Sequence, residues 1–140
     1  MRTVLLAAAA AALLLLNAGP VAAAPTKARD GYWRTSASGH LVELRVAGHR
    51  VVAVSASVET TSTGSPDAEC GTQSHAFLGP FGPRGSTRRG FAIDAAAAGW
   101  SAKGTFASAR KLTGTVRIHP SSRNPCTATV KFTATYDSAD

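Results

Sequence analysis

The sequence predicts an all-β protein: a small antiparallel β-sandwich or barrel of about seven or eight strands with one disulfide, after an N-terminal signal-peptide helix. Three observations support this prediction. Apolar and polar residues alternate through much of the chain, which is the pattern of strands that bury one face. Gly and Pro interrupt the alternating stretches, as they do at the turns of antiparallel sheets. Beyond the N-terminal segment, no stretch keeps a helical period.

The N-terminal segment has the features of a secretory signal peptide. Arg2 precedes an unbroken apolar run of thirteen residues from Val4 to Leu16, and small residues up to Ala24 form an A-x-A cleavage site. Thirteen helical residues reach about 20 Å, which is short of the roughly 30 Å hydrocarbon core of a bilayer. We therefore expect residues 1–24 to be removed and residues 25–140 to form one secreted, extracellular domain without a membrane span.

Cys70 and Cys126 are the only two cysteines of the chain. Because an exported protein enters an oxidising compartment, we expect these two residues to form a disulfide. Residues 25–140 are modest in large apolar side chains, so this covalent link is expected to matter for stability.

The clearest strand runs from Cys126 to Tyr136, where Thr and Lys alternate with an apolar face. That inward face consists of Ala128, Val130, Phe132, Ala134 and Tyr136. A hairpin precedes it in the chain, with Gly48 placed for the positive φ of its turn. Its two inward sets are Val42, Leu44 and Val46, and then Val52, Val54, Ala56 and Val58.

Two further strands follow each other between residues 100 and 118. Their inward sets are Trp100, Ala102, Gly104 and Phe106, and then Leu112, Gly114, Val116 and Ile118. The connection Ala107–Lys111 joins them and carries Arg110 and Lys111. Trp100 and Trp33 are expected to pack in the core rather than to stack on sugars.

Shorter elements complete the expected fold. Gly31–Trp33 opens the domain as a strand, and Phe91–Ile93 is a short one. Asp94 and Gly99 bracket a run of alanines that fits one helical turn, with Asp94 as N-cap. The segments 60–69 and 78–90 are expected to be loops.

Several glycines and core positions give the chain a characteristic layout. They are Gly31-x-Trp33, Val46-x-Gly48-x-x-Val51-Val52, a Cys after a Ser/Thr-rich loop, Gly104-x-Phe106, Gly114-x-Val116 and a second Cys in the last strand. This layout resembles that of small secreted β-sandwich proteins, mostly uncharacterised, of high-GC Gram-positive bacteria. The resemblance spans nearly all of residues 25–140. It implies this fold and export from the cytoplasm, and it assigns no functional residue.

The chemistry of the chain favours a protein that is not an enzyme. The four histidines show no metal-ligand spacing such as H-x-x-x-H, and Gly-x-Ser-x-Gly is absent. A glycosidase needs two carboxylates across a cleft, and Asp67 and Glu69, which share one loop, do not make such a site. We therefore expect no catalytic residue, no metal and no cofactor.

Positive charge is the one compositional signal with functional content, because the whole chain has a formal net charge of +7. Arginine binds phosphate and carboxylate through paired hydrogen bonds. The candidate anion-binding residues are Arg84, Arg88, Arg89, Arg110 and Lys111. A net positive charge also increases solubility by itself, without any binding partner.

Two functions of different classes remain open. The first is a secreted, non-enzymatic module that binds an anionic cell-envelope polymer through its Arg-rich loops. The alternative is a protein-interaction module or protease inhibitor that uses the 78–90 loop, with Arg84 or Arg88 as a basic anchor. We expect no specific nucleic-acid recognition. Strand order, oligomeric state and the clustering of the basic residues do not follow from the sequence.

Overall fold

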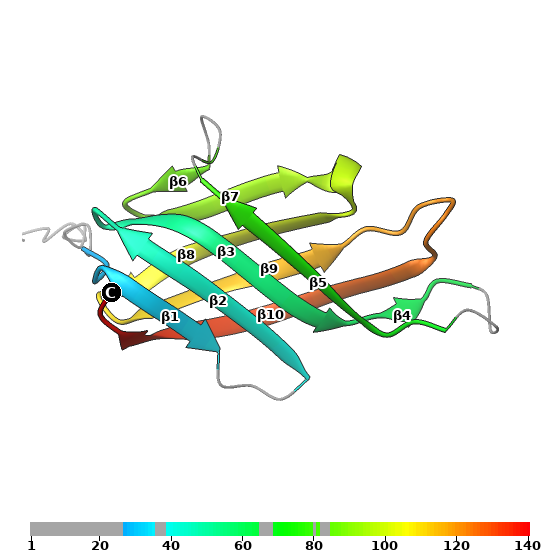
Figure 1. The fold of residues 1–140 in the computed structure, drawn as a ribbon, viewed down its shortest axis with the longest axis horizontal. Coiled ribbons are helices and arrows are strands. Elements are labelled where there is room, and N and C mark those ends of the chain that lie inside the picture. Colours follow the sequence, from blue (N-terminus) through cyan, green and yellow to red (C-terminus); the bar gives the residue numbers. More distant parts are fainter. Residues whose placement is uncertain (1–26, 36–38, 65–68, 80, 82–84) are drawn as a thin grey trace, which may run out of the picture.

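The computed structural model describes residues 27–35, 39–64, 69–79, 81 and 85–140. The expected signal peptide, residues 1–24, lies outside these ranges. The described residues form ten strands and one 3₁₀ turn (Figure 1). The elements are β1 (Gly31–Thr35), β2 (His40–Ala47), β3 (Arg50–Glu59), β4 (Thr61–Ser62), β5 (Thr72–Leu78), β6 (Ser86–Thr87), β7 (Gly90–Ala95), η1 (Ala96–Ala98), β8 (Trp100–Ser108), β9 (Lys111–Ile118) and β10 (Cys126–Ser138).

All ten strands belong to one antiparallel arrangement, which confirms the predicted all-β class. The order is β5-β3-β2-β1-β10-β9-β8-β7-β6, and the short β4 pairs with β10. The first and last strands, β1 and β10, are neighbours, and this pairing joins the two halves of the chain. The sheet curls, so that β5, β3 and β2 face the part formed by β7, β8 and β9 (Figure 1).

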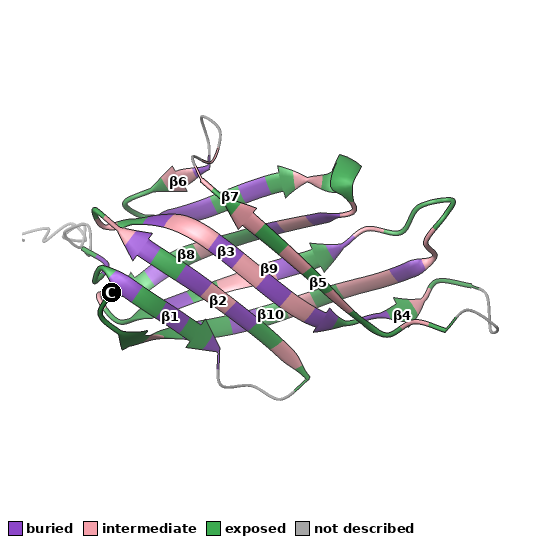
Figure 2. Cartoon of the chain, in the orientation of Figure 1, coloured by how far each residue is buried: buried purple, intermediate pink, exposed green. Residues whose placement is uncertain are grey.

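The core lies between these two facing parts. Buried and exposed residues alternate along most strands, as the bands in Figure 2 show. The largest fully buried side chains are Trp33, Leu112, Val42, Val46, Val51, Val54, Val58 and Val116. Trp33 and Trp100 are only 1% and 3% exposed, so both pack in the core as expected. The ring of Trp33 packs edge-on against Phe106 and Tyr136, at centroid distances of 5.4 and 6.1 Å.

The β2–β3 hairpin confirms one prediction and corrects another. Gly48 has φ +58°, and His49 after it has φ +62°, so the tight turn takes the left-handed region at both positions. A bulge then interrupts the register, with Arg45 opposite Ala53 but Val46 opposite Val51. The extra residue turns Val51 into the core instead of Val52, which the strict alternation placed there.

Three other expectations need revision. The segment 60–69 contains β4, and the segment 78–90 contains β6, so neither is a plain loop. Strand β5 was not predicted at all. The expected helical turn after Asp94 is the three-residue 3₁₀ turn η1; Gly99 ends it with φ +88°, and Asp94 itself belongs to β7.

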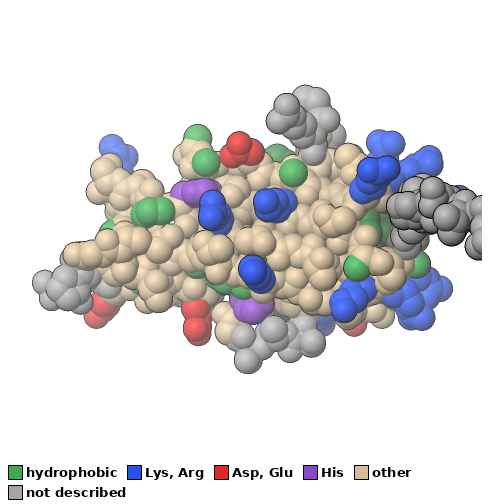
Figure 3. Space-filling model, turned by 180° about the vertical axis from the view of Figure 1, so that it is seen from behind, with side chains coloured by type: hydrophobic (Ala, Val, Ile, Leu, Met, Phe, Trp, Pro, Cys, Tyr) green, Lys and Arg blue, Asp and Glu red, His purple; other side chains and the backbone are tan. Residues whose placement is uncertain are grey.

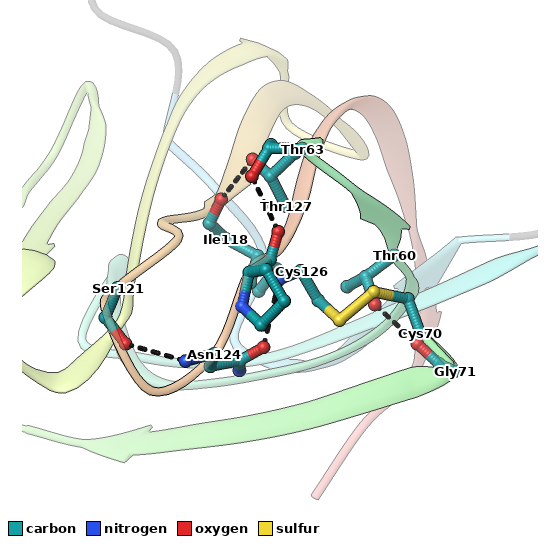
Figure 4. Close-up of a disulfide and its surroundings, with 10 residues drawn as sticks. Thr60, Thr63, Cys70, Gly71, Ile118, Ser121, Asn124, Cys126 and Thr127 are labelled. Atoms are coloured by element: carbon teal, nitrogen blue, oxygen red, sulfur yellow. Dashed lines mark hydrogen bonds between the residues drawn. A yellow bond between two sulfur atoms is a disulfide. The ribbon is translucent and has the colours of Figure 1, made fainter. Parts of the chain in front are cut away.

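The predicted disulfide is present and joins the β4–β5 connection to the start of β10 (Figure 4). The Cα atoms of Cys70 and Cys126 are 5.7 Å apart, and 56 positions separate the residues in sequence. Threonine hydroxyls reinforce the same region: Thr60 Oγ1 donates to Gly71 O at 2.7 Å, and Thr63 Oγ1 donates to Pro125 O at 2.8 Å. We call this end of the sheet the stapled end.

Candidate anion-binding site

The topology brings four of the five predicted anion-binding residues to one end of the sheet. Arg88 and Arg89 occupy the β6–β7 turn, whereas Arg110 and Lys111 lie at the β8–β9 turn. Because β7 pairs with β8 and β8 pairs with β9, the two turns are at the same end, opposite the stapled end. All four side chains are exposed. Arg84 lies outside the described residues.

The same kind of hydrogen bond, from a backbone N–H to a hydroxyl oxygen two residues earlier, stabilises both turns. In Thr87-Arg88-Arg89, the threonine Oγ1 accepts a hydrogen bond from the backbone N–H of Arg89 at 3.1 Å. In Ser108-Ala109-Arg110, the serine Oγ accepts one from the N–H of Arg110 at 3.2 Å. A hydroxyl that bonds the backbone two residues ahead is a standard way to stabilise a turn. The sequence pattern Ser/Thr-x-Arg therefore holds an arginine at each of these turns.

Both turns are also bonded to neighbouring strands. The N–H of Phe106 donates to Arg89 O at 2.9 Å, so the β6–β7 turn is anchored beside β8. The N–H of Tyr136 donates to Arg110 O at 3.0 Å, so the β8–β9 turn is anchored to β10. These bonds fix the backbones from which the arginine side chains project.

Arg29 joins this group, although the sequence analysis did not select it. Its backbone N–H donates to Ala109 O at 3.1 Å, and its carbonyl accepts a hydrogen bond from Trp33 Nε1 at 3.0 Å. The Cζ atoms of Arg29 and Arg110 lie 4.8 and 5.4 Å from the centroid of the Tyr136 ring. Both distances are within the range of cation–π attraction. Tyr136 therefore contacts the guanidinium groups of both arginines.

We call the surface formed by these cations the basic end. Its members are Arg29, Arg50, Arg88, Arg89, Arg110 and Lys111. Arg50 belongs to it because β3 starts at this end, after the β2–β3 turn. Figure 3 shows Lys and Arg side chains gathered at this end of the molecule, with other basic side chains spread over the broad face.

The carboxylates near the basic end are paired with other groups. Asp140 forms a two-pronged ion pair with Arg45, at 3.1 Å for both N–O contacts. Asp30 accepts a hydrogen bond from the N–H of His49 at 2.7 Å, and Asp137 lies 3.9 Å from Arg34. Among the described residues, no carboxylate forms an ion pair with any member of the basic end. These six positive charges are therefore not neutralised by the described part of the chain.

Four other cations of the described residues lie away from the basic end. Lys103, Arg117 and Lys131 lie on the outer face of β8, β9 and β10, where the register places Lys103 and Lys131 on either side of Thr115. Arg123 lies in the β9–β10 connection, at the stapled end. The charge of the protein is thus divided between one concentrated group and several dispersed side chains.

The stapled end contains the polar groups that most resemble catalytic machinery. Ser101 Oγ lies 2.9 Å from His119 Nε2, which is a hydrogen bond of the kind a nucleophile makes with its base. Within the described ranges, no carboxylate contacts His119 and no group of three or more His, Cys, Asp or Glu is arranged to hold a metal ion. The pair is therefore a surface hydrogen bond without the third group of a triad.

The 78–90 segment is held against the sheet where it is described. Gly79 N–H donates to Val52 O at 2.8 Å, and Gly85 O accepts a bond from Ala92 N–H at 2.6 Å. The ring of Phe81 stacks on Phe77 at 5.3 Å. These two bonds continue the pairing of β5 with β3 and of β6 with β7.

Comparisons with protein-family models, curated proteins and solved structures give no match for this chain. In the described residues, no helix has the length and hydropathy needed to cross a membrane.

Proposed function

We propose that this protein is exported and binds an anionic polymer of the cell envelope through its basic end. The observation that supports this proposal is the absence of ion pairs between the six cations of the basic end and the described carboxylates. Five of the six are arginines, which bind phosphate and carboxylate groups in a two-pronged geometry.

The arrangement suits a polymer better than a single small anion. The cations project from three separate turns and from the segment before β1, so they form a broad surface. A chain of repeated negative charges contacts several of them at once, which raises affinity without a deep pocket. A phosphodiester polymer such as wall teichoic acid has this chemistry.

Co-sedimentation with purified insoluble cell wall tests the proposal. We expect retention that requires the teichoic acid and falls as salt rises, because salt screens exposed charges. The variant Arg88→Ala/Arg89→Ala/Arg110→Ala/Lys111→Ala should lose at least tenfold in affinity. The matched control Lys103→Ala/Arg117→Ala/Arg123→Ala/Lys131→Ala removes the same number of charges from exposed positions elsewhere and should retain most of the binding.

Two results would contradict the proposal. One is no retention by the wild-type protein even at low salt, and the other is an equal loss in both variants, which would indicate non-specific attraction. After either result, the alternative function should be tested. The test is whether micromolar concentrations of this protein slow a trypsin-like protease. Recovery of the protein from the culture medium with an N-terminus near Pro25 would test the proposed export.

A further inference from the structure

Strand β5 has a neighbour along one side only. It pairs with β3 over its whole length, from Thr72 opposite Glu59 to Leu78 opposite Ala53. The sheet ends at β5, and within the described residues no other backbone or side-chain group bonds the main chain of residues 72–78. Since the N–H and C=O groups of a strand point alternately to both sides, part of this set has no partner in the described part of the chain.

This edge lacks the features that keep exposed edges from pairing. Such edges usually carry charged residues or proline, or are very short. The sequence of β5, TQSHAFL, has neither proline nor Asp, Glu, Lys or Arg over seven residues. The edge at the other end of the sheet is different, because β6 has two residues and is followed by Arg88 and Arg89.

The interior beside β5 is also incompletely covered. The inward residues Gln73, His75 and Phe77 are only half-buried, although their neighbours Val54, Ala56 and Val58 on β3 are fully buried. His75 stacks on Trp100 at 5.5 Å, and its Nε2 atom is buried without a hydrogen-bond partner in the described structure.

A cavity of about 310 Å³ lies along the same edge. Gln73 and His75 line one side of it, and η1 with the β9–β10 connection lines the other. A strand added beside β5 would pass over this cavity and bond the free main-chain groups.

We propose that the occupant of this edge is the β5 strand of a second copy of the chain, paired antiparallel across a twofold axis. In a register centred on His75, Ser74 lies opposite Ala76 of the second copy and Thr72 lies opposite its Leu78. No like charges meet along the seam, because β5 has no charged residue at neutral pH. The two sheets then continue into each other, which is an isologous interface with one self-complementary strand.

Charge complementarity favours a second copy over an unrelated strand. Antiparallel pairing about this axis places the basic end of one copy beside the stapled end of the other. Glu59 and Glu69 are exposed at the stapled end, next to the start of β5. In the proposed register Glu69 extends past Leu78 of the second copy, on the side of Arg50 at the start of its β3. Glu59 is separated from that arginine by the two β5 strands.

Analytical ultracentrifugation over a concentration series tests this proposal with a charge-swap design. Variants Ser74→Lys/Ala76→Lys and Ser74→Glu/Ala76→Glu each place like charges opposite each other, so each should raise the dimer dissociation constant at least tenfold. An equimolar mixture of the two should restore dimers, because unlike charges then meet. The control Thr113→Lys/Thr129→Lys adds the same charge to the outer face of central strands and should dimerise as the wild type does.

The design remains decisive if one variant folds poorly, as circular dichroism would reveal. Thr72→Lys/Leu78→Lys and its Glu counterpart then make the same comparison at the ends of the strand. A wild-type protein that stays monomeric throughout the micromolar range would overturn the proposal. So would dimers that persist in both charged variants, because such dimers would use another surface.

Discussion

The two ends of the sheet are closed by different means. At the stapled end, the Cys70–Cys126 disulfide and the hydroxyls of Thr60 and Thr63 hold the connections together (Figure 4). At the basic end, closure depends on hydrogen bonds and on aromatic contacts around Trp33 and Tyr136. The covalent link is therefore placed away from the cations. The turns that project charge depend on local hydroxyl bonds and on the core beneath them.

Removal of the disulfide should have the largest effect on stability and little effect on the basic end. In the chain-entropy model, a link across 56 positions contributes about 4 kcal/mol to the free energy of unfolding. We expect Cys70→Ala/Cys126→Ala to lower this free energy by about that amount in urea denaturation. Binding to an anionic polymer per folded molecule should be retained. A variant as stable as the wild type, or one that is folded but does not bind, would contradict this separation of the two ends.

The two buried tryptophans allow a matched comparison. Trp33→Phe removes buried volume together with the bond from Nε1 to Arg29 O, whereas Trp100→Phe removes similar volume at the stapled end. We expect each to lower the free energy of unfolding by about 2 kcal/mol. Only Trp33→Phe should also weaken polyanion binding, by about threefold, because Arg29 loses its anchor. Equal binding by both variants would show that Arg29 does not contribute.

Acid should weaken the stapled end through His75. Burial lowers the pKa of His75 below its ordinary value of 6.5, so the unfolded chain binds this proton more readily than the folded chain. The part of the free energy of unfolding that depends on a neutral His75 is fully present above pH 6.5. It is lost as the pH falls through the lower pKa that His75 has in the folded protein. Urea denaturation between pH 7.5 and about 5 should show a decline in stability that is shallower in His75→Leu. Parallel pH profiles for the two proteins would show that another group causes the decline.

The strands that the sequence predicts best are those with one face on the core. In β10, Thr and Lys alternate with Phe132 and Ala134, so a period of two is visible without any knowledge of the fold. Strand β5 was missed for the opposite reason. Its inward residues are Gln73, His75 and Phe77, and an edge position does not require the first two to be apolar. A strand that is only partly covered therefore lacks the full alternation of apolar and polar residues.

The candidate site was predicted only as far as local sequence determines it. The β8–β9 turn was predicted with its Arg110 and Lys111, because two strands flank it. Arg29 was missed because its contact with Tyr136 depends on the pairing of β1 with β10. The two residues are far apart in the sequence, so no short motif indicates this contact. The bulge that turns Val51 inward is likewise a consequence of pairing, and the valines of β3 do not reveal it.

The smallest expected effect concerns the carboxylates beside the basic end. Asp140 is paired with Arg45 at 3.1 Å, so it neutralises an arginine that a polyanion would otherwise reach. Asp137 lies 3.9 Å from Arg34, which has a nearer partner in Glu43 at 3.2 Å. The hydrogen bond and charge of Asp140 raise the pKa of Arg45, so this guanidinium keeps its charge. Both side chains of the pair are exposed. Exposed ion pairs add little to stability, and Asp137→Asn/Asp140→Asn should leave the unfolding transition nearly unchanged.

Polyanion binding by this variant should nevertheless rise by about twofold at low salt, because two negative charges are removed near the bound polymer. The gain should disappear as salt rises. A matched control, Glu59→Gln/Glu69→Gln, removes two charges from the stapled end and should change binding less. If the control gains as much as the Asp variant, net charge alone governs binding and the position of the cations does not. If the Asp variant alone gains, the polymer contacts the end of the sheet where β1, β2 and β10 meet.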